Sequence, residues 1–198
     1  MIEVEKKFAP TKKQLNKLLT GAKLLEEIIF SDCYFDMSDY SLILSDRWLR
    51  LREGKPELKL PLGPIGHTDI SVDLYDEVTD GVRIGKILKL PEEKDFKKAL
   101  AKAGYKQVAS FVTKRKKYKK KGFNIDVDEI DFGYRLIEIE TLIKDRMGMD
   151  KASEKILNFA KSSGLTVSYV RGKFVEYIFR YNKNLYREMK KAGFFPQS

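Results

Sequence analysis

Cysteine and histidine are nearly absent from this sequence. Among its 198 residues, Cys33 is the single cysteine and His67 the single histidine. One cysteine excludes an intramolecular disulfide framework and a cysteine-rich zinc site. His67 stands in a loop rich in proline and glycine, so a catalytic site built on histidine has little support. Carboxylates, lysines and arginines are left as the main candidates for chemistry.

Long hydrophobic runs are also missing. No apolar stretch approaches the ~20 residues of a membrane-spanning helix, and the N-terminus lacks the apolar region of a signal peptide. We therefore expect a cytoplasmic protein with no membrane partner. Hydrophobic residues make up 42% of the chain and aromatic residues 12%, which is enough for a packed core. The length predicts one domain, spanning 1–198.

The chain carries an excess of positive charge. Its net charge of +10 indicates an anionic partner, whether phosphates, nucleic acid or a membrane surface, although a solvated basic surface explains the same number. Residues 116–121 (Lys-Lys-Tyr-Lys-Lys-Lys) form the one dense basic run. We interpret this run as a solvated hairpin tip rather than a nucleic-acid contact.

Hydrophobic periodicity divides the chain into strands and helices. The predicted strands cover 2–8, 23–36, 47–52, 57–60, 68–78, 106–120, 124–128 and 134–143. The predicted helices cover 12–20, two segments within 80–104 separated near Pro91, 150–163 and 171–190, while 40–45 form a short irregular or helical link. This order predicts an α+β protein with about eight mostly antiparallel strands, flanking helices and C-terminal helices at about 150–190 that pack on or plug the sheet structure.

Charged residues keep one sign along several strand faces. Residues two apart share a face of a strand, and this spacing joins acidic pairs in three strands and basic residues in three others: Glu3/Glu5, Asp126/Asp128 and Glu138/Glu140, and Arg50/Arg52, Lys59 and Arg115. Two architectures fit this alternation. One is an open sheet with its charged face in water, and the other is a closed barrel with a charged interior.

The sorting of charge favours the barrel. Like charges on one face repel each other, so such an interior needs ligands of the opposite sign. The acidic faces predict a divalent metal, and the basic faces predict phosphate. A ligand set made only of oxygen atoms points to Mg²⁺ or Mn²⁺, with Ca²⁺ as an inhibitory competitor.

The same residues resemble a known superfamily. The opening Glu-x-Glu-x-Lys is similar to that of the CYTH superfamily, the triphosphate tunnel metalloenzymes, and within it the thiamine triphosphatases match best. The resemblance spans about three quarters of the chain in the expected order and is carried by Ile2–Phe8, Asp46–Glu53, Glu57–Pro61, Val108–Arg115 and Asp126–Ile143.

This resemblance implies an eight-stranded antiparallel β-barrel that forms a triphosphate tunnel open at both ends. It implies Mg²⁺-dependent hydrolysis of a terminal phosphoanhydride in a small-molecule triphosphate. We expect a monomer without a nucleic-acid partner. The positions that match metal ligands of the family are Glu3, Glu5, Asp126, Glu138 and Glu140, with Asp128 and Glu77 as further candidates. The positions that match triphosphate-binding residues are Lys7, Arg50, Arg52, Lys59, Arg115 and Lys173.

Three aromatic or catalytic assignments keep two interpretations each. Trp48, the single tryptophan, is either a core residue or a platform whose indole attracts a cationic thiazolium ring. Lys59 and Tyr34 either act together in acid–base catalysis, with Lys59 pushed toward neutrality by surrounding cations, or serve as a phosphate clamp and a packed wall residue.

One segment departs from the family pattern. Residues 67–78 are longer than in the thiamine triphosphatases, so Asp69 and Asp73 have no matching position and are expected to be surface charges. The alternatives to thiamine triphosphate hydrolysis are an inorganic tripolyphosphatase in the same tunnel and, outside catalysis, a basic module that binds RNA or polyphosphate. Adenylate cyclase and RNA triphosphatase activities also occur in the superfamily, and the context of Trp48 disfavours both.

Overall fold

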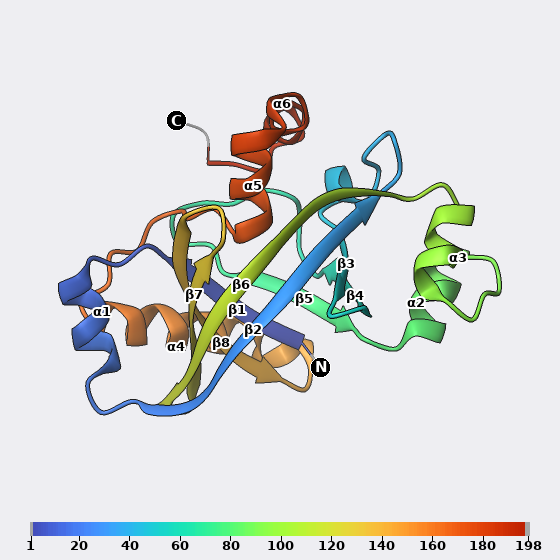
Figure 1. The fold of residues 1–198 in the computed structure, drawn as a ribbon. Coiled ribbons are helices and arrows are strands. Elements are labelled where there is room, and N and C mark those ends of the chain that lie inside the picture. The colour runs from blue at the N-terminus through green and yellow to red at the C-terminus, as the bar shows by residue number, and fades with distance from the viewer. Residues whose placement is uncertain (1, 197–198) are drawn as a thin grey trace.

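Eight antiparallel strands close into a barrel. The computed structural model describes residues 2–196, and the strands follow one another around the barrel in the order β1-β5-β4-β3-β2-β6-β7-β8. This arrangement confirms the closed barrel that the sorting of charge favoured (Figure 1). The strands are β1 (Ile2–Phe8), β2 (Lys23–Asp36), β3 (Trp48–Arg52), β4 (Lys55–Pro61), β5 (Asp73–Val78), β6 (Lys106–Lys120), β7 (Phe123–Ile130) and β8 (Tyr134–Ile143).

Helices surround this barrel. They are α1 (Lys12–Leu19), α2 (Gly81–Leu88), α3 (Phe96–Lys102), α4 (Met149–Ser162), α5 (Lys173–Tyr181) and α6 (Lys183–Lys191), with 3-10 turns η1 (Ile43–Ser45) and η2 (Arg146–Gly148). Within residues 2–196, no helix combines the length and the apolar character needed to cross a membrane.

Two predicted elements are shorter than expected. The predicted strand 68–78 begins only at Asp73, because 67–72 form a loop in which the Thr68 amide donates to Ser71 Oγ at 2.8 Å. The predicted helix 171–190 is divided at Asn182, whose side chain accepts from the Leu185 amide at 3.1 Å and so caps α6. An N-cap asparagine starts a new helix because its side chain satisfies a free backbone N–H.

The N-terminal strand closes the barrel. β1 pairs with β5 on one side and with β8 on the other. In that register Glu5 lies opposite both Asp73 and Glu140, and Lys7 lies opposite Glu138. Glu3, Glu5 and Lys7 share the inner face, because side chains two apart point the same way.

The apolar core lies outside the barrel, between strands and helices. Ile2, Val4 and Phe8 of β1 pack with Ile156 and Phe159 of α4. A second cluster joins β3 and β4 to α2 and α3. The third cluster lies at one end of the barrel interior, where α5 and α6 pack against Tyr34 and Phe111. Apart from this end, apolar residues are on the outer faces of the strands, and the charged alternate positions are left to the interior.

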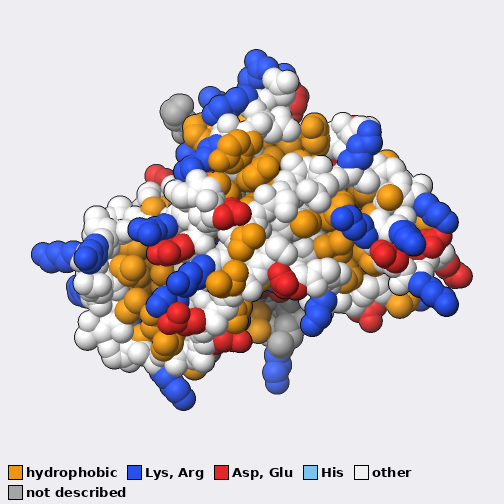
Figure 2. Space-filling model, viewed as in Figure 1, with side chains coloured by type: hydrophobic (Ala, Val, Ile, Leu, Met, Phe, Trp, Pro, Cys, Tyr) orange, Lys and Arg blue, Asp and Glu red, His pale blue; other side chains and the backbone are white. Residues whose placement is uncertain are grey.

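Helix α5 lies over one end of the barrel (Figure 1). Its Phe174 ring is 4.5 Å from the ring of Tyr34 and 5.4 Å from that of Trp48. Phe194, which follows α6, approaches Trp48 edge-on at 5.9 Å. Figure 2 shows hydrophobic side chains gathered where these helices meet the barrel. This end is therefore aromatic, whereas the interior below it is charged.

The outer face of β2 and β6 differs from the rest. These two long strands cross the front of the barrel in Figure 1 without a helix over them. Leu25, Ile29 and Val112 on this face are exposed. The helices therefore leave this part of the barrel surface uncovered.

Candidate functional site

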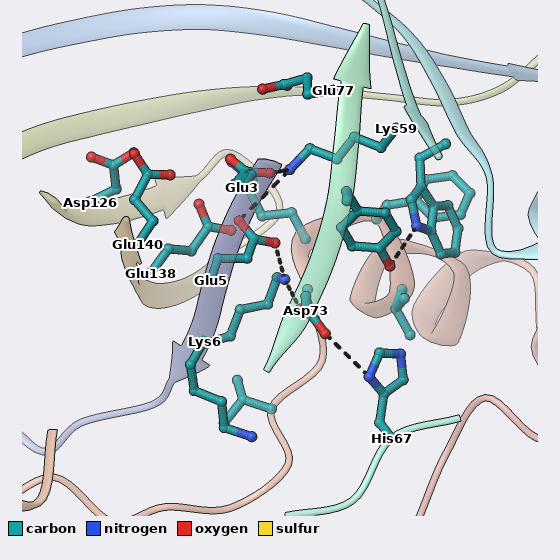
Figure 3. Close-up of a pocket in the computed structure, with 18 of the residues that line it drawn as sticks. Glu3, Glu5, Lys6, Lys59, His67, Asp73, Glu77, Asp126, Glu138 and Glu140 are labelled. Carbon is teal, nitrogen blue, oxygen red and sulfur yellow. Dashed lines mark hydrogen bonds and ion pairs between the residues drawn. The ribbon is translucent and has the colours of Figure 1, made fainter. Parts of the chain in front are cut away.

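The interior of the barrel contains a cavity lined mainly by charged side chains. Its volume is about 260 Å³. Strands β1 to β6 contribute basic or aromatic side chains to its lining, and β7 and β8 contribute carboxylates. Figure 3 shows the carboxylates of Asp126, Glu138 and Glu140 on the same side of the cavity as Glu3 and Glu5. All residues predicted to bind metal or triphosphate line this cavity, apart from Asp128.

Three carboxylates lie close enough to share one cation. Glu3 and Glu5 of β1 and Glu140 of β8 each offer an oxygen atom, and these atoms lie within 4.8 Å of one another. Burial and the negative charge of Glu5 raise the pKa of Glu3 to about 8. A positive ligand placed among these oxygens would favour the ionised form of Glu3.

Asp126 of β7 has one carboxylate oxygen without a partner. Its Oδ2 pairs with Arg115, but its Oδ1 is buried and accepts no hydrogen bond from residues 2–196. Burial raises the pKa of Asp126 to about 7 even though Arg115 opposes the shift. A buried acceptor without a donor is costly, so this oxygen is suited to a cation or water inside the cavity.

Arg115 of β6 contacts three carboxylates. Its guanidinium donates to Asp128 through Nε and Nη2, both at 2.6 Å, to Glu138 through Nη2 at 2.6 Å, and to Asp126. Lys173, the first residue of α5, donates to Asp128 Oδ2 at 2.7 Å. Asp128 is fully buried and hydrogen-bonded to both cations. It does not line the cavity, unlike the other candidate carboxylates.

Glu138 lies among positive charges. Burial alone would raise its pKa, but Lys173 and Arg115 outweigh burial and hold the pKa well below its usual value. Glu138 is therefore ionised and available as an oxygen ligand. Glu140, by contrast, accepts a hydrogen bond from Asn124 Nδ2 at 3.0 Å.

Lys59 of β4 is charged, contrary to expectation. Its ammonium group pairs with Glu3 and lies 3.7 Å from Glu5 Oε2. Burial favours the neutral amine, but these two carboxylates outweigh it and raise the pKa of Lys59. The predicted shift toward neutrality is wrong because carboxylates, not cations, are the nearest neighbours. Tyr34 lines the same cavity and accepts a hydrogen bond from Arg50 Nη1 at 3.2 Å.

Arg50 and Arg52 of β3 are positioned by acidic residues that the sequence did not single out. Arg52 forms two hydrogen bonds with Asp32 of β2, at 2.8 and 3.0 Å. Arg50 pairs with Glu57 of β4 at 2.5 Å and lies 3.6 Å from Glu77 of β5. Asp32 shares a strand face with Tyr34, two residues away, and Glu57 likewise shares one with Lys59. Strand periodicity alone could therefore have placed both carboxylates on the faces that carry site residues.

The segment 67–73 contributes to the cavity, which corrects another expectation. Asp73 is not a surface charge, since its carboxylate pairs with Lys7 and lies 3.2 Å from His67 Nδ1. Lys7 also donates to Glu5 at 2.5 Å. Asp69 is exposed, as expected, and accepts from the Tyr169 amide at 2.9 Å. His67 therefore lies at the cavity, although its loop context gave no sign of this.

A hydrogen-bonded chain holds the single tryptophan. Trp48 Nε1 donates to the Tyr75 hydroxyl at 3.0 Å, and this hydroxyl donates to Asp46 Oδ1 at 2.9 Å. Trp48 also contacts Phe174 and yet still lines the cavity. Trp48 thus packs against α5 and also lines the cavity, and its role as a platform for a cationic ring stays a prediction.

The charges of the interior are more mixed than their order in sequence suggests. Each acidic pair meets a cation from another strand, as in Arg115 with Asp126 and Lys59 with Glu3. The expectation that like charges need external ligands to offset their repulsion is therefore only partly right. Internal ion pairs supply much of the compensation. Glu3, Glu5 and Glu140 still bring oxygen atoms within 4.8 Å of one another, and Asp126 Oδ1 has no hydrogen-bond partner among residues 2–196.

The chain is similar to known proteins over most of its length. A model of the CYTH domain matches residues 1–170. The thiamine-triphosphatase of Homo sapiens is 32% identical over 210 aligned residues, which cover 96% of this chain and 89% of that protein. The PH1819 protein from Pyrococcus horikoshii OT3 has a TM-score of 0.66 at 24% identity, over 90% of this chain and 98% of that one. A putative adenylyl cyclase from Hippeastrum, described by its dominant triphosphatase activity, has a TM-score of 0.53 at 18% identity, over 90% and 94% of the two chains.

Proposed function

This chain belongs to the CYTH family, and we propose on that basis that it hydrolyses thiamine triphosphate to thiamine diphosphate and phosphate. The proposal is supported by the similarity to human thiamine-triphosphatase across nearly the whole chain. The single observation that carries it is the closed tunnel in which carboxylates on β1, β7 and β8 face cations on β3, β4 and β6. A polyphosphate between a metal ion and several cations fits this distribution of charge.

The cations of the tunnel would bind the triphosphate. Lys7, Arg50, Arg52, Arg115 and Lys173 all line the cavity. Each is already paired with a carboxylate, which fixes the orientation of its N–H groups before a substrate binds. Guanidinium groups suit phosphate oxygens because their N–H donors form a planar fork. These side chains would hold the phosphates in place and stabilise the charge that develops as the terminal phosphoryl group leaves.

The carboxylates fit a hard divalent cation. Glu3, Glu5 and Glu140 supply oxygens within 4.8 Å of one another, and Asp126 adds a buried oxygen without a donor. An all-oxygen set of this kind suits Mg²⁺, with Mn²⁺ as a substitute and Ca²⁺ as an inhibitor. Glu138, ionised beside Arg115, completes the proposed ligands. When bound, the ion would polarise phosphate oxygens and activate a water molecule.

Lys59 and Tyr34 are proposed to act on protons. Because Glu3 and Glu5 keep Lys59 protonated, its Nζ can donate to an oxygen of the leaving diphosphate as well as hold it. Burial raises the pKa of Tyr34, so its hydroxyl keeps its proton and, oriented by Arg50, acts as a hydrogen-bond donor to the substrate. The expected monomeric state and cytoplasmic location stay predictions from the sequence.

A phosphate-release assay tests the proposal directly. We would compare kcat/KM for thiamine triphosphate, tripolyphosphate and ATP with Mg²⁺, Mn²⁺ and Ca²⁺. Glu140→Gln, which removes one charge from the carboxylate group, is expected to lower kcat/KM by roughly 10²–10³-fold, since lost transition-state electrostatics have effects of this size. Glu129→Gln is the matched control, because Glu129 lies on the same sheet but pairs with Arg135 at the exposed surface.

Inorganic tripolyphosphatase activity is the second candidate. It is favoured by the number of cations along the tunnel, which would bind phosphate groups whether or not an organic group is attached. A kcat/KM for tripolyphosphate above that for thiamine triphosphate would select it. Binding of polyphosphate or RNA without metal-dependent phosphate release, unchanged by Glu138→Gln, would instead contradict both enzymatic functions.

A further inference from the structure

Two segments that are distant in sequence, 46–48 and the strand that carries Tyr75, meet at the indole of Trp48. Asp46 follows η1, Trp48 begins β3, and Tyr75 lies on β5 with β4 between them. The hydrogen bonds run in one direction, from Trp48 Nε1 to the Tyr75 hydroxyl at 3.0 Å and from that hydroxyl to Asp46 Oδ1 at 2.9 Å. Every polar atom of this chain of contacts is therefore committed to one orientation.

Asp46 is held firmly at the end of this chain of contacts. Its side chain is buried, with 5% of the residue exposed. Its backbone has φ 58°, in the left-handed region that aspartate tolerates better than most residues. The Asp46 amide donates to the carbonyl oxygen of Ile43 at 2.9 Å, which closes η1. The turn thus places a carboxylate, rather than an apolar side chain, against the Tyr75 hydroxyl.

We propose that Asp46 and Tyr75 are positioning residues that fix the indole of Trp48 at the cavity wall and so make the tunnel selective for a triphosphate with a cationic organic group. This inference rests on the proposed function, because it concerns how the same tunnel distinguishes thiamine triphosphate from tripolyphosphate. Neither residue needs to touch the phosphates to do so.

The chemistry of the indole explains the need for such a chain. The tryptophan N–H is a donor only, and it needs an acceptor when it is buried. A tyrosine hydroxyl accepts it better when its own proton is given to a carboxylate, because consecutive hydrogen bonds polarise one another. The polarised indole is richer in electrons on its face, which strengthens attraction to a cationic ring. The Lys59 ammonium lies 5.6 Å from the centre of the Tyr75 ring, within the range of a cation–π contact.

The charge of Asp46 acts in the same direction. A buried carboxylate beside the aromatic part of the cavity attracts a thiazolium cation and repels the additional negative charge of inorganic tripolyphosphate. Asp73 and His67 also face this part of the cavity, and Asp73 is paired with Lys7. Asp46, in contrast, accepts a hydrogen bond from a neutral hydroxyl rather than pairing with a lysine or arginine.

Trp48 is the single tryptophan of the chain, so intrinsic fluorescence reports this site alone. Tyr75→Phe removes the acceptor of the indole N–H while keeping the ring, and Asp46→Asn keeps an acceptor for Tyr75 while removing the charge. Both emission and quenching by unphosphorylated thiamine would be measured. We expect Tyr75→Phe to shift the emission and to raise the thiamine concentration needed for half-maximal quenching about tenfold, which is the size of effect expected when a buried donor loses its acceptor. Asp46→Asn should have an intermediate effect.

Kinetics separate positioning from a loss of structure. For Tyr75→Phe we expect KM for thiamine triphosphate to rise about tenfold, with kcat little changed and KM for tripolyphosphate within about twofold. Tyr134→Phe is the matched control, because its hydroxyl donates to the backbone oxygen of Arg171 at 2.7 Å and takes no part in the Trp48 contacts. This control is expected to leave emission and the ratio of the two KM values unchanged.

The outcomes decide clearly. The inference is overturned if Trp48 emission is unchanged in Tyr75→Phe, or if the KM values for both substrates rise equally. A shifted emission without any change in the ratio of KM values also overturns it. If the wild-type protein does not hydrolyse thiamine triphosphate, the proposed function fails separately. Emission and thiamine quenching then decide the positioning of Trp48 on their own, with loss of quenching in Tyr75→Phe in favour and unchanged quenching against.

Discussion

Replacement of Arg115 by methionine is expected to destabilise the protein strongly. The guanidinium of Arg115 donates to Asp126, Asp128 and Glu138, and only 9% of its side chain is exposed. Methionine fills much of the same volume without charge. Arg115→Met therefore leaves the three carboxylates in the barrel wall without their shared cation, while the apolar packing outside the barrel stays intact.

The size of the effect follows from the surroundings of each carboxylate. Removing one partner from a buried ion pair costs about 3–5 kcal/mol. Three carboxylates do not triple this cost, because Asp128 keeps Lys173 at 2.7 Å and Asp126, with a pKa of about 7, takes up a proton readily. We therefore expect a loss of about 3–5 kcal/mol in the free energy of unfolding. Asp128→Asn in the same chain should restore at least about 1 kcal/mol, since residues of one network are coupled.

Urea unfolding followed by Trp48 emission measures this loss. The experiment is done at pH 7.5 with a chelator, so that no divalent ion replaces the missing cation. The dependence on urea concentration should keep its slope, because the surface exposed on unfolding is unchanged. The midpoint alone should then move.

Arg135→Met is the matched control. Arg135 pairs with Glu129 at 3.2 Å, but 78% and 52% of the two side chains are exposed. Exposed pairs contribute about 0–1 kcal/mol, so this variant should unfold close to the wild type. If Arg115→Met also loses less than about 1 kcal/mol, the interior pairs do not stabilise the barrel as reasoned above.

Two further predictions concern stability alone. Thr11→Ala removes the capping box of α1, in which the Thr11 side chain accepts from the N3 backbone, and should cost about 1 kcal/mol in urea unfolding; an unchanged midpoint would contradict this. Burial raises the pKa of Asp46 to about 6, against the hydrogen bond from Tyr75 and the charge of His67, with Asp73 adding to the rise. The folded state therefore binds the proton of the Asp46 carboxyl more tightly than the unfolded state does. The stability that this proton provides is present below about pH 4 and is lost as the pH rises through 6. Residue 46 cannot titrate in Asp46→Asn, so the free energy of unfolding of this variant relative to wild type should rise by up to about 3 kcal/mol between pH 4 and pH 7.5. The same difference between variant and wild type at both pH values would refute this prediction.

The inner face of the barrel was largely predictable from sequence. Alternation along each strand placed Glu3, Glu5 and Lys7 together, and the same rule placed Glu138 beside Glu140. This works because the period of two holds for any strand, whatever its partners. The closed barrel followed from the sign of the charges, since an open sheet has no reason to separate them.

The pairing across strands was not predictable in the same way. Lys59 was expected among cations, but the register places β4 and β5 so that its ammonium reaches Glu3 of β1. His67 was missed because its loop has no periodic pattern, and Asp73, the first residue of β5, was missed because the family pattern gave it no matching position. Which side chains meet depends on register and on the order of strands around the barrel, and both are set by contacts between distant segments.

A break in the C-terminal helix was also missed. The apolar positions of α5 and α6 follow one helical period, and Asn182 between them looks like an ordinary polar residue. Its role as an N-cap shows only when the chain turns there. The turn allows Phe174 and Phe194 to reach Trp48 from two sides.

The position of β1 has a consequence for the order in which the protein is made. This strand is synthesised before the other seven, but its partners are residues 73–76 and 137–143. Most of the chain must therefore leave the ribosome before the ring of strands can close, and contacts so distant in sequence form slowly. Until then Glu3 and Glu5 lie in an unpaired segment, apart from Glu140. The group of carboxylates thus comes into being with the last strand pairing, and a cation bound there would favour the closed ring over any partly assembled chain.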